Sequence, residues 1–183
     1  LRSLAAAEAG DTVTLLADID VTSAMYSGDT RFNLWINKSL TIDGDGHTLT
    51  VKGRGIGVQG TSSNIDVVFK EMTVQNVGNA NGRCIDTRGK LNRLTLDGVT
   101  LTTATSSYTG YLQPLTIGGN QSTAATVTIK DSVIETVAAA NKGYAITTFN
   151  PVTMTVTDST IRGWACLNIK ESKIGRASCR ERV

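Results

Sequence analysis

Short runs of alternating hydrophobic and polar residues recur along this chain. The clearest is residues 94–101, Leu-Thr-Leu-Asp-Gly-Val-Thr-Leu, in which two apolar runs flank an Asp-Gly kink. Similar octads occupy 67–74, 127–134 and 154–161, and residues 40–51 open in the same way around a longer turn. Alternation of this kind predicts strands with one buried face. The kink residues are types that tolerate turn geometry.

The octads are spaced at a nearly fixed interval. The third position of each copy is apolar, and these positions are Ile42, Phe69, Leu96, Ile129 and Val156. The intervals between them are 27, 27, 33 and 27 residues. A fixed period with a constant internal pattern is typical of a repeat architecture. We therefore predict that these five side chains stack in one ladder.

A third short apolar run closes each repeat. These runs lie at 56–58, 84–85, 115–117, 145–146 and 165–167. Three short strands per repeat, with no helical stripe between them, favour a coil whose turns (rungs) have three faces and pair in parallel about 4.8 Å apart. One rung cannot bury its inner side chains alone, but stacked rungs enclose a continuous apolar column.

This rung pattern, over about residues 11–170, resembles the right-handed parallel β-helix of the pectate-lyase-like superfamily. The resemblance implies an all-β solenoid with three short strands per rung. Proteins with such scaffolds include lyases, hydrolases, adhesins and phage tailspikes, so the resemblance indicates a fold more strongly than a function.

Three segments are expected. Residues 1–10 combine high helix propensity with a terminal Gly10, which predicts a short N-terminal capping helix that covers the first rung. Residues 11–172 form the β-helix domain, which we interpret as a fragment truncated at its C-terminal end. Residues 173–183 resemble the translation of a common sequencing-library adapter, and we interpret them as a non-native tail.

Excluding this tail changes the charge of the chain. The full sequence has a formal net charge of +2, and residues 173–183 contribute +3 of it, which leaves −1 for residues 1–172. No electrostatic argument for a nucleic-acid partner remains. The longest apolar runs are also too short to span a membrane, so no membrane insertion is expected in this segment.

Two cysteines remain outside the tail, Cys84 and Cys166. They fall three rungs apart, which the strand spacing converts to roughly 14 Å, beyond the reach of a disulfide. We expect both to be buried thiols that pack as small apolar residues.

The evidence for catalysis is limited. The Asn-Thr-Asp, Asp-Asp, Gly-His-Gly and Arg-Ile-Lys motifs expected of polygalacturonase-like hydrolases are absent. Asp86, with Arg83 and Arg88 beside it, is an alternative catalytic group that resembles a pectate-lyase-like arrangement. The corresponding position one rung later is Thr116, so no second acid supports it. We expect no cofactor, and Ca²⁺ only under this lyase alternative.

The loop Asp43-Gly44-Asp45-Gly46-His47 contains the only histidine of the chain. Asp43 and Asp45 are an alternative pair of metal ligands, but the twelve-residue calcium loop with its closing Glu is incomplete. Asp and Gly residues are also what a tight turn between two strands requires. We therefore interpret the loop as a turn and predict no metal site.

Three tyrosines are the candidate ligand-binding residues. Tyr108 and Tyr111 lie in a long inserted loop, and Tyr144 follows the corresponding insertion one rung later. Loops of successive rungs emerge on the same side, so the three rings can form a patch on which sugar rings stack. The alternative is that these rings pack only against the loops.

The sequence favours a non-catalytic extracellular module of a bacterial surface protein, either a structural stalk or an adhesin that binds a glycan or a host surface. The alternative is a polysaccharide lyase or glycoside hydrolase acting on an acidic polysaccharide, with its site partly in missing rungs. The expected partners are a polysaccharide or host glycan and further rungs or domains of the parent chain. The expected location is extracellular or at the cell surface.

Overall fold

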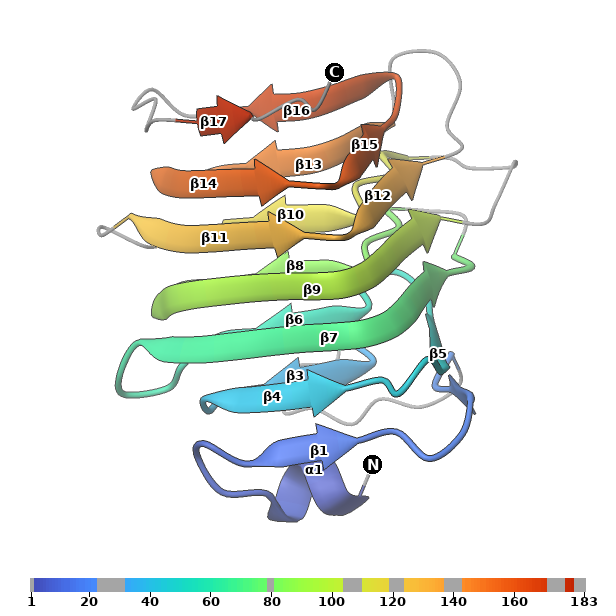
Figure 1. The fold of residues 1–183 in the computed structure, drawn as a ribbon, viewed down its shortest axis with the longest axis vertical. Helices are drawn as coiled ribbons and strands as arrows, with labels where there is room; N and C mark the ends of the chain where they lie inside the picture. The colour runs from blue at the N-terminus through green and yellow to red at the C-terminus, as the bar shows by residue number, and fades with distance from the viewer. Residues whose placement is uncertain are drawn as a thin grey trace.

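The computed structural model describes residues 2–22, 32–78, 81–103, 110–118, 124–136, 143–170 and 177–179. The chain forms a nearly all-β solenoid in which two parallel sheets run along the coil axis (Figure 1). Every strand pairing is parallel, as expected when each strand lies over its counterpart in the next turn. The prediction of an all-β parallel coil is therefore confirmed.

Sheet A has 11 strands and bends around two sides of the coil. Its main path contains β1 (Thr12–Thr14), β4 (Leu40–Asp43), β7 (Ile65–Asn76), β9 (Leu91–Thr103), β11 (Ala125–Lys130), β14 (Val152–Thr157) and β17 (Ala177–Cys179). Its second side adds β2 (Ile19–Asp20), β5 (Thr48–Val51), β12 (Val133–Thr136) and β15 (Thr160–Arg162).

Sheet B has six strands and closes the coil on its third side. Its strands are β3 (Leu34–Ile36), β6 (Ile56–Val58), β8 (Ile85–Thr87), β10 (Leu115–Ile117), β13 (Tyr144–Thr148) and β16 (Ala165–Ile169). These strands contain the third apolar run of each repeat.

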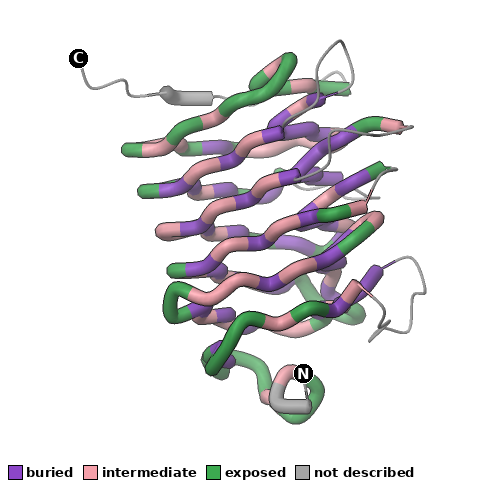
Figure 2. Tube along the Cα trace, turned by 90° about the vertical axis from the view of Figure 1, so that its right-hand side faces the viewer, coloured by how far each residue is buried: buried purple, intermediate pink, exposed green. Residues whose placement is uncertain are grey.

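The predicted ladder is present. Ile42 pairs with Phe69, Phe69 with Leu96, Leu96 with Ile129, and Ile129 with Val156. The first four side chains belong to the buried core and Val156 packs against it. Burial alternates along the strands of sheet A, as the tube in Figure 2 shows. Stacking like residues in register therefore produces the continuous apolar column inside the coil.

The kink in each octad has a common backbone conformation. Glu71, Gly98, Asp131 and Asp158 have φ values of 47°, 66°, 48° and 46°. The residues immediately before them pair in register, so the four kinks lie above one another. Asp and Gly adopt this left-handed region more readily than most residues, and this preference explains their recurrence at the bend.

The N-terminal helix is shorter than predicted. Helix α1 spans Arg2–Ala6, and Gly10 follows a turn with a φ of 98°. The prediction of a helix through Ala9 is therefore wrong at its C-terminal end. The amide of Gly10 instead donates to the carbonyl of Ser39, which leads the chain into β1.

The two cysteines differ in exposure. Cys84 is buried, whereas Cys166 is exposed, and both thiols are free. The prediction that both are buried is wrong for Cys166, because among the described strands β16 has a neighbour on one side, β13, and none that covers its other side. In the tail interpreted as non-native, β17 pairs with β14. This pairing does not test the origin of the tail.

Candidate functional site

The outer face of sheet B presents one residue from each strand in a single file. We call this file the outer column; its members are Trp35, Gly57, Asp86, Thr116, Thr147 and Asn168. Ile85, next to Asp86, belongs to the apolar core. Successive side chains of a strand point to opposite faces, so Asp86 points away from the core.

Asp86, a member of the outer column, forms ion pairs with arginines beside the column. Arg83 Nη1 lies 2.6 Å and Arg88 Nη2 lies 2.7 Å from Asp86 Oδ2, and Arg54 Nη1 lies 4.0 Å from the same oxygen. The Asp86 side chain is only 1% exposed. The structure thus brings together the three residues of the alternative catalytic group, and three guanidinium groups surround one carboxylate.

Several polar atoms in and beside the outer column are buried without a hydrogen-bond partner among the described residues. They are Asp86 Oδ1, Arg83 Nε, Arg88 Nε, Thr116 Oγ1, Thr147 Oγ1 and Asn168 Nδ2. Burying a polar atom without a partner is costly, so native proteins seldom leave several in one place. The concentration of such atoms in the outer column makes this face the strongest candidate site among the described residues.

The column begins in an aromatic pair. Trp35 and Phe32 have ring centroids 5.1 Å apart, and Arg88 Cζ lies 5.7 Å from the Phe32 ring centroid. A Cβ atom added to Gly57 would lie 2.5 Å from Trp35 Cε3. The indole therefore covers Gly57, and no larger residue fits there without displacing it.

An aromatic row flanks the column at the start of the later strands. The Tyr111 and Tyr144 rings stack with centroids 5.8 Å apart, and Trp164 meets Tyr144 edge-on, also at 5.8 Å. Tyr111 is 46% exposed and Trp164 is 55% exposed. Of the three predicted tyrosines the structure brings Tyr111 and Tyr144 together, whereas Tyr108 lies outside the described residues.

Lys170, which follows β16, contacts both this row and Phe149, which follows β13. Lys170 Nζ lies 5.5 Å from the Tyr111 ring centroid and 5.4 Å from that of Phe149. Cation–π contacts of this kind favour a fixed position for the ammonium group. These contacts connect the aromatic row to Phe149 and Lys170, which follow the C-terminal ends of β13 and β16.

The loop after β4 forms a turn. Asp45 has a φ of 47°, and its amide donates to Asp43 Oδ1 at 3.1 Å. Asp43 Oδ2 pairs with Lys70 Nζ at 2.7 Å, and His47 Nδ1 lies 3.3 Å from Asp18 Oδ1. Asp43 thus already has protein partners for both oxygens. Within the described part of the chain, no group of three or more His, Cys, Asp or Glu side chains could hold a metal.

Sequence reasoning missed Thr116, Thr147 and Asn168 as members of one polar file on sheet B. It also missed Trp164, Phe149 and Lys170 as neighbours of the tyrosines. Aligning the third apolar runs on Ile85, Leu115 and Ile146, which share a register, would have found the two threonines, because each directly follows one of these residues. No comparable sequence pattern predicts the contact of Lys170, because its long side chain reaches the ring of Tyr111, which is far away in sequence.

Comparison with known proteins gives no family assignment. No protein-family model, curated protein or solved structure matches this chain. No described helix is long and apolar enough to cross a membrane.

Proposed function

We propose that this chain is a non-catalytic, extracellular glycan-binding module of a bacterial surface protein, built on a β-solenoid of the pectate-lyase-like type. The observation that carries the proposal is the row formed by Tyr111, Tyr144 and Trp164, whose two outer members are about half exposed. Exposed aromatic rings in a row are costly to leave in water and are typical of binding surfaces.

The chemistry of the face suits a sugar chain. Tyrosine and tryptophan offer an apolar ring with a polar tip, which matches the alternating C–H and hydroxyl surface of a sugar. The three rings lie at or before the first residues of β10, β13 and β16, which are successive strands of sheet B. A linear glycan lying along the coil axis would therefore contact the rings one after another. Lys170, whose ammonium group lies 5.5 Å from the Tyr111 ring centroid, supplies a hydrogen-bond donor beside the row.

Glycan binding is tested by screening the purified chain on a glycan array and measuring each hit by calorimetry. We expect Tyr111→Ala and Trp164→Ala each to weaken binding at least about tenfold, as removal of an interface aromatic commonly does. Trp164→Phe keeps an aromatic ring and should retain most of the affinity. Val77→Ala removes another exposed apolar side chain and serves as the matched control.

Two results would contradict this proposal. If no glycan binds while the chain is folded, the structural-stalk interpretation replaces it. If a glycan binds equally well to the Tyr111→Ala and Trp164→Ala variants, the binding surface lies elsewhere on the coil.

The second candidate is an enzyme acting on an acidic polysaccharide, and one observation favours it. Asp86, Arg83 and Arg88 converge in one cluster whose positive charges outnumber its carboxylate. Guanidinium groups bind carboxylates in a two-pronged geometry, so a uronate is the fitting substrate class.

A lyase assay on polygalacturonate with and without Ca²⁺ separates the two candidates. Turnover that is lost in Arg88→Lys, with the fold retained by circular dichroism, would establish the enzyme and overturn the non-catalytic proposal. Absence of turnover on a panel of acidic polysaccharides, combined with glycan binding, supports the first candidate.

A further inference from the structure

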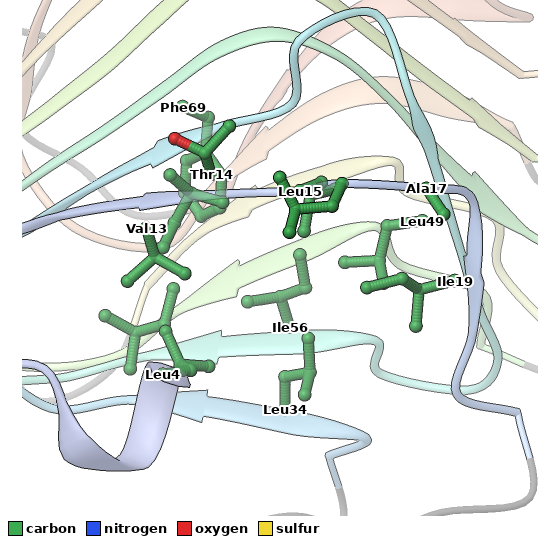
Figure 3. A pocket seen from close by; sticks show the side chains of 13 residues that line it. Leu4, Val13, Thr14, Leu15, Ala17, Ile19, Leu34, Leu49, Ile56 and Phe69 are labelled. Atoms are coloured by element: carbon green, nitrogen blue, oxygen red, sulfur yellow. The ribbon is translucent and has the colours of Figure 1, made fainter. Parts of the chain in front are cut away.

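The N-terminal end of the coil contains an apolar cavity of about 260 Å³. Figure 3 shows the side chains that line it, with Leu4 from α1, Val13 and Leu15 from the first turn, and Leu34 and Ile56 from sheet B. Of its 13 lining residues, Thr14 is the only one with a polar side chain. This cavity is separate from the outer face of sheet B.

The sequence explains why space remains there. In the middle of the coil, residues from the three sides fill the interior, as Leu96 and Leu101 from sheet A and Leu115 from sheet B do. At the N-terminal end, Leu4 is the described residue of α1 that lines the cavity, and Ala5, Ala6 and Ala7 follow it. Ala5 and Ala6 are exposed, and the short side chain of Ala7 adds little volume, so space remains beside Leu4.

Hydrogen bonds hold the rim of the cavity in place. The amide of Leu15 donates to the carbonyl of Asp43 at 2.8 Å, and the amide of Val21 donates to that of Thr50 at 3.0 Å. Asp18 Oδ1 accepts the amide of Thr48 at 2.8 Å. The segment between β1 and β2 is therefore tied to the next rung, and the cavity is preformed because its walls cannot collapse inward without breaking these bonds.

We propose that this cavity binds a small aromatic hydrocarbon group, independently of any glycan on the outer face. An engineered cavity of about 150 Å³ lined by leucine, isoleucine and phenylalanine stays dry and binds benzene. The cavity here is larger and has a similar lining, so a monocyclic aromatic ring fits with room for an alkyl substituent. Leu16, which is 87% exposed and lies at the rim, can cover a bound ring.

The test uses benzene as the probe and phenol as its polar counterpart. At a benzene concentration about ten times the dissociation constant, we expect the melting temperature to rise by about 3–6 °C. Phenol should bind roughly tenfold more weakly, because the apolar lining leaves its hydroxyl without a partner. Methyl NMR signals of Leu34, Leu49 and Ile56 should shift on titration, and those of Leu115 should not.

Variants that fill the cavity provide the control. Leu4→Trp and Val13→Phe place a ring in the space and should abolish the benzene-induced shift, whereas Val152→Phe, at the other end of the coil, should leave it unchanged. The proposal is overturned if benzene moves neither the melting temperature nor the cavity methyl signals of the unaltered chain, or if filled variants that fold bind benzene equally well. If both filled variants fail to fold, the methyl shifts of the unaltered chain decide: benzene-induced shifts located outside the cavity would overturn the proposal.

Discussion

Val68 and Phe69 are adjacent residues of β7 whose side chains lie on opposite faces of the strand. Phe69 is fully buried in the ladder between Ile42 and Leu96, whereas Val68 is half-buried on the outer face. We expect Phe69→Ala to lower the free energy of unfolding by about 3–5 kcal/mol, because it removes buried apolar surface and leaves a cavity. Urea denaturation measures the difference.

Val68→Ala is the matched control, because it shortens a side chain one residue away on the opposite face. Its expected cost is about 1 kcal/mol or less. Equal losses in the two variants would contradict the assignment of the inner and outer faces.

The cysteines allow a chemical test at the same scale. Burial raises the pKa of the Cys84 thiol to about 12, so it is almost entirely protonated and unreactive at pH 8. Cys166 is exposed. In the native protein, iodoacetamide should modify Cys166 and spare Cys84, and denaturation should expose both. Peptide mass mapping reads each site separately. Modification of native Cys84 at the rate of Cys166 would show that the core opens there.

At the scale of elements, an ion pair links β4 to β7. The hydrogen bond from Lys70 lowers the pKa of Asp43, and the same contact raises the pKa of Lys70. Because the folded-state pKa of Asp43 is depressed, its contribution to stability is present above about pH 4, the unfolded value, and is lost as the pH falls through the folded value. The Lys70 contribution is present below about pH 10 and is lost as the pH rises through its folded value.

We therefore expect Lys70→Met to reduce the loss of stability on acidification from about pH 5 to pH 2. Urea denaturation at several pH values measures the slope. Lys90→Met is the control, because the Lys90 ammonium contacts the carbonyl of Thr61 and no described carboxylate. If the acid slope of Lys70→Met equals that of the unaltered chain, the ion pair makes no contribution in solution.

The strands in the middle of the coil were more predictable from the sequence than the two ends of the coil. Alternation and spacing gave the octad ladder and its register, because a strand has a side-chain period of two and the core admits only one face. The same pattern could not give the length of α1 or the exposure of Cys166. Those depend on what lies beyond the first and last rungs, where a residue loses the neighbour that its repeat position implies.

At the scale of the whole molecule, stability should vary along the coil. Strand β9 pairs with strands on both sides, whereas within the described part of the chain β15 pairs with β12 alone and β16 with β13 alone. In a stacked-repeat protein each rung is stabilised mainly by its neighbours, so the ends open before the middle. We expect amides of β9 to exchange at least roughly tenfold more slowly than those of β16 when followed by hydrogen-exchange mass spectrometry. Uniform protection along the coil would contradict this prediction.

The candidate site was only partly predictable at this scale. Asp86, Arg83 and Arg88 are close in sequence, so their convergence could be suspected from the chain alone. The unpartnered atoms of Thr116, Thr147 and Asn168 could not, because a threonine in a strand is usually a solvated outer residue.

The in-register stacking of the octads has a consequence for how the length of this protein can change. Inserting or deleting one complete 27-residue repeat moves everything above it by one strand spacing, about 4.8 Å, and leaves every remaining ladder intact. Gene duplication within this chain can therefore lengthen it in increments of one strand spacing. An insertion of one residue inside a strand, by contrast, exchanges the inner and outer faces of the residues that follow it. The length of the molecule can therefore change in evolution while the packing of its core is preserved.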